Sequence, residues 1–555
     1  DPWERLEKLR EQMPSALLQM LFRGSNALGY TNYPDNVLRR FIQLSAQSGI
    51  DVFRIFDALN WIENMRVSID EVLKSGKICE ASICYSGDLS SPAEKKYTLE
   101  YYLKMAQKLE KMGVHFLAIK DMAGLCKPKA AKILFKELKK NIKIPIHFHT
   151  HDTSGNGVAT LLNASDAGVD IVDVAIDSWS GFTSQPSFGA VLESLDGNNR
   201  DPKISSAVVR TAANYWEGVR KQYQPFESKT RTSMSEVYLH QMPGGQYTNL
   251  REQARSMGIT DERWPELASM YAEVNKIFGD VIKVTPISKV VGDMAIYMLA
   301  NNIQIEDVLD PKKDVGFPAS VIEFFSGRLG QPYKGFPKAL QKKILKGKKP
   351  INYRFGSKLP SLKIKNRTKE LEKNYNEIIS EKDTISQIFF PEVFDEYMKH
   401  KKKFGNTSVI PTSNYFFGMN TDEEIYVSIE PGKTLIIRYF TLSEPNEKGF
   451  RTVYFELNGQ ARSVDIKDNS IAVDDLAKEI ADPSNKDHVA APIPGLLVDV
   501  AVTEGIKVPK GAKLCTIEAM KMETVIYADQ PGTVERLCVK AGENIEAQQL
   551  LLIIK

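Results

Sequence analysis

Cysteine is scarce in this sequence, and its few copies are not paired. The 555 residues include five cysteines, at positions 79, 84, 126, 515 and 538, and they form no C-x-x-C motif. An odd and scattered set indicates free thiols in a reducing compartment and argues against a disulfide framework. Cys79 and Cys84 could be interpreted as metal ligands, but buried structural thiols are the interpretation we prefer.

A large net charge and long apolar segments are also absent. The formal net charge is +3, which is too small to indicate nucleic acid or a membrane surface as a partner. No apolar run approaches the ~20 residues of a membrane-spanning helix. The polar opening DPWERLEKLREQMPS is helical in character and is not a signal peptide. The composition is that of an ordinary soluble chain, and its length predicts several domains.

An internal repeat is present near the C-terminal end. Residues 494–517 match residues 531–554 at a constant spacing of 37 positions, with Gly495 aligned on Gly532. Each copy consists of short β-branched strands separated by glycine turns, which predicts a flattened β-sandwich with approximate two-fold symmetry. Taken alone, Lys521 in the stretch EAMKMET would be a solvated surface lysine. Its place between the two copies predicts instead that it lies at the tip of a protruding hairpin.

The chain alternates between apolar strands and amphipathic helices up to about residue 180. This alternation predicts an α/β fold with a parallel sheet, and the number of units favours a (β/α)8 TIM barrel over an open sheet. The six strands are expected within ALLQMLFRG, DVFRIFDA, KICEASICYSGD, HFLAIKD, IPIHFHTHD and DIVDVAID. Barrel chemistry lies at the carboxyl ends of the strands. Polar residues collect at those ends in this chain: Arg23, Asp57, Asp88, Lys120, Asp121, His149, His151 and Asp177.

The composition along the chain predicts four domains. Residues 1–250 are expected to form the barrel, and residues 251–410 a helical extension of it. Residues 411–481 alternate in a hairpin-like pattern and are expected to form a small β-rich assembly or allosteric domain. Residues 482–555 hold the repeat and form the last domain.

One predicted strand, IPIHFHTHD, carries three histidines at alternate positions: His147, His149 and His151. Their side chains should point to one face of the strand, and grouped imidazoles at a barrel mouth indicate a metal site. The alternative is a set of polar core histidines bonded to the backbone. Lys120 ends the preceding strand, and its pKa should be depressed beside a cation. A neutral Lys120 could take up carbon dioxide and become a carbamate ligand; the alternative is a salt-bridged lysine.

Eight motifs, in order along nearly the whole chain, resemble the pyruvate carboxylase family. They are LFRGSNALGYTNYPDN, DVFRIFDALNW, LAIKDMAGL, HFHTHDTSG, SGFTSQPS, PGGQYTNL, KVTPISK and VYFELNGQ. The tetrapeptide AMKM inside the repeat is similar to the biotinyl domain of biotin-dependent carboxylases, whereas lipoyl domains usually place an acidic residue before the lysine. The resemblance therefore runs from the family's carboxyltransferase domain to its biotin carboxyl carrier domain.

The resemblance implies a metal centre and a substrate site in the barrel. Lys120, as a carbamate, together with His149 and His151 would ligate a divalent metal, Mn or Zn. Arg23 would hold the carboxylate of pyruvate, a task that suits a guanidinium group. Thr285 would shuttle a proton between the pyruvate methyl group and biotin.

The resemblance also implies where biotin is attached and where it binds. Lys521 would carry biotin through an amide on its side chain. Tyr30, Ser288 and Lys289 would line the biotin pocket of the barrel. A tethered carrier of this kind keeps its cofactor at a high effective concentration near a distant site.

The implied activity is carboxyl transfer from carboxybiotin to pyruvate, through metal-stabilised enolpyruvate, giving oxaloacetate. This is the second half-reaction of pyruvate carboxylase, a ligase that depends on ATP overall. One alternative is a subunit of the oxaloacetate decarboxylase or transcarboxylase type, which shares the barrel. A second alternative is an inactive biotin carrier and assembly fragment.

Two parts of the family pattern are missing from this sequence. There is no biotin carboxylase domain that binds ATP, and no first barrel strand with the Arg-Asp-Ala-His-Gln motif, whose aspartate is a further metal ligand. We therefore expect residues to precede Asp1. The expected partners are pyruvate or oxaloacetate, biotin protein ligase, the biotin carboxylase domain of the full-length chain and three further copies in a homotetramer. We expect neither nucleic acid nor membrane as a partner, and a location in the bacterial cytoplasm or the mitochondrial matrix.

Overall fold

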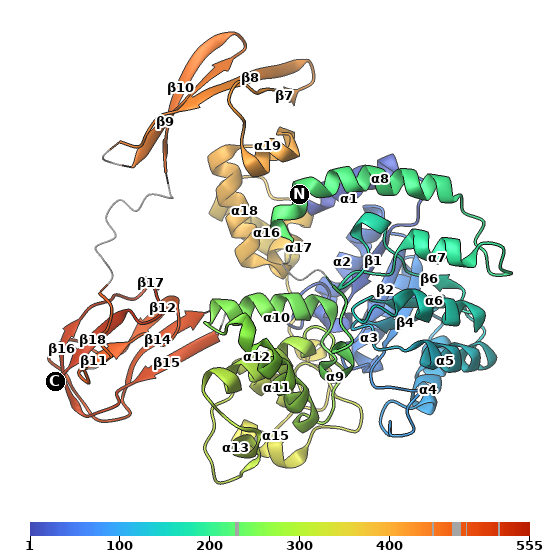
Figure 1. The fold of residues 1–555 in the computed structure, drawn as a ribbon, viewed down its shortest axis with the longest axis horizontal. Helices are drawn as coiled ribbons and strands as arrows, with labels where there is room; N and C mark the ends of the chain where they lie inside the picture. The colour runs from blue at the N-terminus through green and yellow to red at the C-terminus, as the bar shows by residue number, and fades with distance from the viewer. Residues whose placement is uncertain (228–231, 447–448, 469–478, 484, 520–521) are drawn as a thin grey trace. The chain divides into compact units, whose positions relative to one another are not determined.

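The computed structural model describes residues 1–555 apart from positions 228–231, 447–448, 469–478, 484 and 520–521 (Figure 1). The chain divides into two compact units, Asp1–Phe390 and Pro391–Lys555, and each is described by itself. Within the described residues, no helix combines the length and the apolar character needed to cross a membrane. The cysteines are free, and four of them, including Cys79 and Cys84, are buried, as the preferred interpretation predicted.

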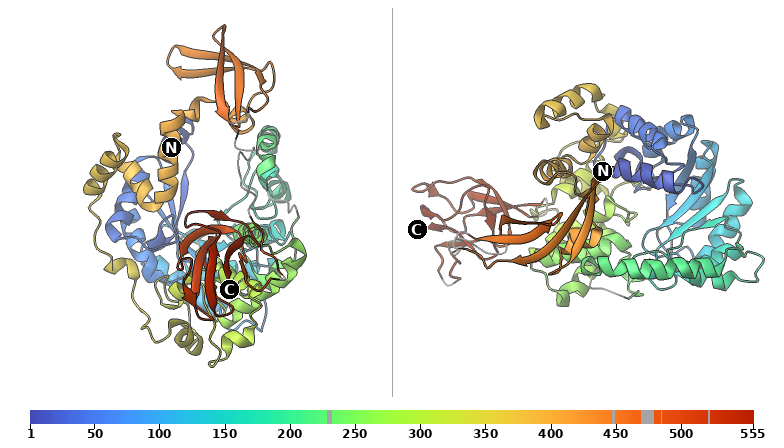
Figure 2. Two further views of the ribbon diagram at one scale, coloured as in Figure 1. Left: turned by 90° about the vertical axis from the view of Figure 1, so that its left-hand side faces the viewer. Right: turned by 90° about the horizontal axis from the view of Figure 1, so that it is seen from above.

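The first unit is built around a sheet of parallel strands that follow one another in chain order (Figures 1 and 2). The six strands are β1 (Gln19–Phe22), β2 (Val52–Phe56), β3 (Ile78–Cys84), β4 (Phe116–Asp121), β5 (Ile146–Thr150) and β6 (Ile171–Val172). The crossover helices are α2 (Asp35–Gln47), α3 (Ile62–Lys74), α4 (Leu99–Lys111), α5 (Pro128–Asn141) and α6 (Gly157–Asp166). Sequential parallel strands with helical crossovers are the arrangement of a TIM barrel. The predicted α/β fold class is therefore confirmed, with six barrel strands in the described part of the chain.

The crossover helices form because their apolar residues recur on one face. In α2 the buried face includes Val37, Leu38 and Phe41, at the spacing of one helical stripe. The sheet side of this packing is apolar as well, since β2 is buried at all of its positions. The helix is followed by Gly49 with φ +123, where a Cβ atom would meet the side chain of Arg10. Glycine is required there both by the backbone conformation and by the close approach.

The rest of the first unit is helical and shares one hydrophobic core with the barrel. The core runs from Trp3 to Phe389, and the ring of Tyr33 packs edge-on against Phe389 with centroids 4.5 Å apart. These helices are α1 (Pro2–Gln12), α7 (Phe188–Leu195), α8 (Ser206–Tyr223), α9 (Val237–His240), α10 (Gly244–Ser256), α11 (Trp264–Ile277), α12 (Ile287–Ala300), α13 (Ile305–Leu309), α14 (Ala319–Phe325), α15 (Lys338–Leu345), α16 (Ile364–Tyr375) and α17 (Glu381–Phe389). The four-domain division of the chain stays a prediction.

The second unit begins with two helices and a four-stranded antiparallel sheet. The helices are α18 (Pro391–Phe404) and α19 (Thr412–Phe417). The strands are β7 (Glu424–Glu430), β8 (Lys433–Leu442), β9 (Phe450–Leu457) and β10 (Gln460–Lys467), in the order β10-β9-β8-β7. Neighbouring strands in this order are consecutive in the chain, so the sheet is a meander of hairpins, as the alternating pattern indicated.

The repeat forms two four-stranded sheets in which equivalent strands are 37 residues apart. The strands are β11 (His488–Ala490), β12 (Gly495–Val500), β13 (Lys507–Val508), β14 (Lys513–Ala519), β15 (Met522–Tyr527), β16 (Gly532–Leu537), β17 (Asn544–Ile545) and β18 (Leu550–Ile554). Strands β12, β13 and β14 correspond to β16, β17 and β18. The copies exchange edge strands, because β13 pairs with β16 of the second copy and β17 pairs with β12 of the first. The predicted two-fold β-sandwich is therefore confirmed.

The two hydrophobic cores of this sandwich obey the same symmetry. Leu497 and Ile517 lie in one core, and their partners Val534 and Ile554 lie in the other. Strand β14 pairs with β15 up to the pair Ala519 and Met522. The predicted attachment lysine, Lys521, lies outside the described residues.

Candidate functional site

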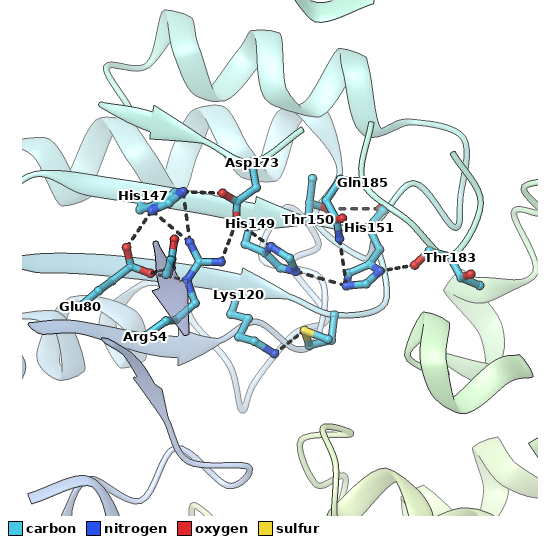
Figure 3. Close-up of polar contacts among 12 residues, drawn as sticks. Arg54, Glu80, Lys120, His147, His149, Thr150, His151, Asp173, Thr183 and Gln185 are labelled. Carbon is cyan, nitrogen blue, oxygen red and sulfur yellow. Dashed lines mark hydrogen bonds and ion pairs between the residues drawn. The ribbon is translucent and has the colours of Figure 1, made fainter. Parts of the chain in front are cut away.

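The predicted site lies at the carboxyl ends of β4 and β5. Lys120 is next to His149 in the parallel register, and Cys84 of β3 is next to Lys120 on the other side. Residues adjacent in a parallel register project from the same face of a sheet. His151 follows β5 directly and completes the group, as Figure 3 shows. The structure therefore brings together the three predicted metal ligands.

The two imidazoles face each other through their Nε2 atoms (Figure 3). The Nε2 atom of His149 is 3.2 Å from that of His151. Nδ1 of His149 is 2.7 Å from an oxygen of Asp173, and Nδ1 of His151 is 2.5 Å from the carbonyl oxygen of Thr183. Because each Nδ1 faces an acceptor, the hydrogen-bond network assigns the ring proton to Nδ1 and leaves a lone pair on each Nε2. The side-chain nitrogen of Gln185, 3.5 Å from Nε2 of His151, agrees with that assignment.

Two imidazole lone pairs that converge in this way fit a cation between or beside them. Metal-ligating histidines usually donate their other ring N–H to a carboxylate or a backbone carbonyl, and both histidines have such a partner here. In the described part of the chain, no cluster of three or more His, Cys, Asp and Glu side chains is arranged to hold a metal ion. A third metal ligand would therefore have to come from another residue type, and the adjacent Lys120 is the candidate.

Burial favours the uncharged forms of these groups. It lowers the pKa of His151 to about 3, and the neighbouring His149 and Lys120 act in the same direction. Burial also lowers the pKa of His149, against the opposing hydrogen bond to Asp173. Burial lowers the pKa of Lys120 to about 8, with Arg54 and Arg23 adding to the shift. A depressed pKa leaves a substantial fraction of a lysine as the neutral amine near pH 7–8, which is the form that reacts with carbon dioxide.

The amine of Lys120 is buried against an aromatic ring and a thioether. Its Nζ atom lies 4.4 Å from the centre of the Phe56 ring and contacts the sulfur of Met122. Its side chain is 1% exposed, and within the described residues no carboxylate forms an ion pair with it. The described residues therefore give no support to the salt-bridged alternative for Lys120, and they favour a group that reacts as the neutral amine.

The third histidine of the motif has a different role. Nδ1 of His147 is 2.7 Å from Glu80, and its Nε2 is 2.8 Å from Asp173. Both ring nitrogens are thus engaged with carboxylates, so His147 cannot also ligate a metal. The predicted ligand set, which names His149 and His151 but not His147, is consistent with this arrangement.

Arg23 follows β1, and its half-buried guanidinium is only partly satisfied. Its Nη1 donates to the carbonyl oxygen of Leu28 at 2.6 Å, while its Nε is buried without a hydrogen-bond partner among the described residues. Its guanidinium lies 5.6 Å from the centre of the Tyr30 ring, and burial lowers its pKa. A cation with a buried, unsatisfied donor favours an anionic ligand.

Thr285, Ser288 and Lys289 form a second group, at the start of α12. The hydroxyl oxygens of Thr285 and Ser288 are 3.4 Å apart, and Lys289 is paired with Asp293 at 2.7 Å. Among the described residues, no hydrogen bond or ion pair joins this group to Lys120.

Several polar residues at the strand ends serve the local backbone and not the site. Asp57 accepts from the backbone N–H groups of Leu59 and Trp61, and Asp121 accepts from those of Leu125 and Cys126. Such carboxylates hold the turns that follow β2 and β4. The carboxylates of Asp57 and Asp121 are therefore structural. Their position at strand ends did not by itself distinguish them from metal ligands.

Sequence reasoning missed Arg54, Glu80 and Asp173. Arg54 lies in the middle of β2, Glu80 lies in β3, and Asp173 follows β6 (Figure 3). A signal was available, because charged residues in the middle of otherwise apolar strands are rarely buried without a partner.

Three family models match the chain. "Conserved carboxylase domain" matches residues 237–438, "HMGL-like" residues 46–179, and "Biotin-requiring enzyme" residues 487–554. These matches include β2 to β6 of the barrel, the helices from α9 to α19 and the duplicated β domain.

Similar proteins and structures agree with these models. Pyruvate carboxylase of Bacillus subtilis is 49% identical over the whole chain, and that of Staphylococcus aureus is 47% identical. Each match covers 48% of the relative, so the chain spans about half the length of the curated relatives it matches. The carboxyl transferase domain of Rhizobium etli pyruvate carboxylase, also solved with pyruvate and biocytin, is 51% identical. That match covers 84% of this chain and 79% of the solved chain, with a TM-score of 0.82.

Proposed function

This chain belongs to the pyruvate carboxylase family, and from that premise we propose that it transfers a carboxyl group from biotin to pyruvate. The product is oxaloacetate. The observation that carries the proposal is the convergence of His149 and His151 beside the buried Lys120 at the mouth of the barrel. The relatives reported above give no support to the oxaloacetate decarboxylase alternative.

The metal centre would be held by His149, His151 and a carbamate on Lys120. When bound, a divalent cation such as Mn or Zn supplies Lewis-acid stabilisation to a substrate oxygen that becomes negative. The chain contributes the orientation of the two imidazoles, which Asp173 and the Thr183 carbonyl hold in place. Burial of Lys120 contributes the neutral amine from which a carbamate forms.

Arg23 and Thr285 are proposed to act on the substrate. The unsatisfied guanidinium of Arg23 would bind the carboxylate of pyruvate, which fixes the methyl group in one orientation. The hydroxyl of Thr285 can both donate and accept a proton, so it would relay the methyl proton to biotin's ureido nitrogen.

Biotin would be attached to Lys521 and would bind beside Tyr30, Ser288 and Lys289. The attachment rests on the EAMKMET motif and on the match to biotin-requiring enzymes. Tyr30 is 56% exposed and presents an aromatic face next to Arg23, which suits a flat ureido ring.

The wider context of the reaction is also proposed. The partners would be pyruvate, biotin protein ligase, the biotin carboxylase domain of a longer chain, and further copies in a homotetramer. The compartment would be the bacterial cytoplasm or the mitochondrial matrix, since pyruvate carboxylases of Bacillus subtilis and mitochondrial relatives are similar to this chain.

The test is the transfer reaction in reverse, with the protein as it is expressed. Oxaloacetate and biocytin are added with Mn²⁺, and the pyruvate released is measured by a coupled lactate dehydrogenase assay. We expect release that depends on biocytin and falls at least ~100-fold in Thr285→Ala, while Thr285→Ser retains most of the rate. Absence of biocytin-dependent release from the unaltered protein, or an unchanged rate in Thr285→Ala, would overturn the proposal.

A further inference from the structure

Four charged or polar side chains meet inside the barrel, deeper than the proposed metal ligands (Figure 3). Arg54 comes from β2, Glu80 from β3 and His147 from β5, and Asp173 follows β6. The first three are 6%, 1% and 5% exposed. These four residues, here called the barrel quartet, do not include a proposed metal or substrate ligand.

The barrel quartet is closed by direct contacts. Arg54 Nε donates to Glu80, and Arg54 Nη1 donates to Oδ2 of Asp173 at 2.6 Å. Nη2 of Arg54 lies 3.0 and 3.1 Å from the two ring nitrogens of His147. His147 in turn bridges Glu80 and Asp173 through its two nitrogens. Within the barrel quartet, each carboxylate therefore has two partners from different strands, and Glu80 also accepts from the side-chain amide of Gln19 in β1 at 3.2 Å.

Asp173 connects the barrel quartet to the proposed metal centre. Its Oδ1 faces His147, and its Oδ2 accepts from Arg54 and also faces Nδ1 of His149 at 2.7 Å. An arginine can only donate a hydrogen bond, so it keeps Asp173 oriented as an acceptor. Toward such an acceptor, His149 must place its ring proton on Nδ1, and its Nε2 lone pair then points at His151.

We propose that Arg54 and Glu80 are positioning residues that act through Asp173 to set the tautomer and the ring orientation of His149. Glu80 fixes the guanidinium of Arg54, the guanidinium fixes Asp173, and Asp173 fixes the imidazole. This inference rests on the proposed function, because it assumes that His149 binds a divalent metal ion.

A purely structural role explains the barrel quartet less well. Taking four ionisable groups out of water is costly, and apolar side chains of similar volume would often stabilise a protein as well or better. On the same face of the sheet, Phe56 of β2 and Ala118 of β4 are buried and apolar. A role in orienting the proposed metal ligand His149 would explain why charged side chains are present at these positions.

The experiment compares metal binding in two variants and one control. Asp173→Asn has the same shape, but its amide can donate toward His149 and reverse the ring tautomer. Arg54→Met/Glu80→Met removes one cation and one anion together, so that no single charge is left unpaired by the change. Asp166→Asn removes an exposed carboxylate at the end of α6 and is the matched control.

The readouts are the affinity for Mn²⁺ by competition with a chromogenic chelator, the visible spectrum of the Co²⁺-loaded protein, and thermal unfolding. We expect Asp173→Asn to bind Mn²⁺ roughly 10- to 100-fold more weakly, and the double variant roughly 10-fold more weakly, with an altered Co²⁺ spectrum. The control should stay within about twofold. Histidine ¹⁵N spectra should show that the His149 proton moves from Nδ1 to Nε2 in Asp173→Asn.

The inference is overturned if both variants fold cooperatively and bind Mn²⁺ like the unaltered protein, or if the unaltered protein binds no Mn²⁺. Weaker binding in a variant that does not unfold cooperatively also counts against it, because a structural role would then be sufficient. The proposed function can fail separately: the unaltered protein would bind Mn²⁺ and lose affinity in both variants, but would release no pyruvate with biocytin.

Discussion

The interior of the barrel and the interior of the duplicated β domain are built in opposite ways. The barrel buries Arg54, Glu80, Lys120 and His147 among apolar side chains. The two cores of the β domain contain apolar residues and a cysteine, arranged with two-fold symmetry. Buried ionisable groups lower stability unless they are paired, whereas an apolar core only contributes to it. The difference agrees with the proposed location of the chemistry in the barrel, while the cores of the β domain contribute stability alone.

The largest expected effect is the loss of transfer through the tethered biotin of the β domain while the chemistry of the barrel stays intact. Lys521→Arg keeps the positive charge but removes the amine to which biotin is attached, so transfer through the tethered cofactor should be lost entirely. Transfer with free biocytin should persist, because the barrel is unaltered. The measurements are the intact mass of the protein, which reports biotin, and pyruvate release without added biocytin, which reports the tethered cofactor, and with it. Lys540→Arg, also in the β domain, is the control, and loss of the biocytin reaction in Lys521→Arg would contradict the separation.

A cavity in the β domain should affect stability and leave the barrel chemistry intact. Leu497 is fully buried, and Leu497→Ala should lower the free energy of unfolding of the second unit by about 2–5 kcal/mol. Its neighbour Leu496 is 41% exposed, and Leu496→Ala should change that free energy by less than about 0.5 kcal/mol. Denaturant unfolding measures both variants. A change in Mn²⁺ affinity in Leu497→Ala would show that the two regions are coupled.

Removal of a buried charge from the first unit should instead raise the free energy of unfolding. Burial lowers the pKa of Lys283 to about 8, and its nearest carboxylate, Asp280, is 3.7 Å away. The unfolded chain holds this proton up to about pH 10.4, so the cost of burying the charge is fully present below pH 8 and disappears as the pH rises to about 10.4.

Lys283→Met should therefore stabilise the protein at pH 7 by up to about 3 kcal/mol, and the gain should shrink between about pH 8 and 10.4. Denaturant unfolding at several pH values measures this gain. Lys276→Met, at an exposed position of α11, should show no such dependence. A gain that does not change with pH would mean that Lys283 is not buried as a charge.

The smallest expected effect concerns the glycine pair of the PGGQ motif. A Cβ atom on Gly244 would lie 3.0 Å from the Cβ and carbonyl oxygen of Thr183, whose carbonyl holds His151. Gly244→Ala should displace that carbonyl and weaken Mn²⁺ binding by roughly 10-fold or less. Gly245 has open space around it, so Gly245→Ala is the matched control. Equal Mn²⁺ affinities in the two variants would exclude this role for Gly244.

Much of the site could be predicted because its residues lie in short motifs. Lys120, His149 and His151 occur at the ends of strands that the local pattern already indicated, and the register brings them together. Arg23, Thr285, Ser288 and Lys289 were assigned by resemblance, and their proposed roles remain to be tested. Strand periodicity alone left open whether two or three of the imidazoles ligate a metal, because it cannot say which ring nitrogens are already engaged.

The sequence by itself determined the order of strands and helices, the parallel barrel architecture and the two-fold β domain. These features follow from local periodicity, glycine turns and a repeat of constant spacing, which are properties of neighbouring residues. Only the tertiary structure decided that Arg54, Glu80 and Asp173 form one network with His147. Arg54 is 26 positions from Glu80 and 119 positions from Asp173, and no local pattern relates residues so far apart. Which ring nitrogen of His149 and of His151 carries the proton depends on partners that folding supplies. The resemblance of these two histidines to a pair of metal ligands depends on the same partners.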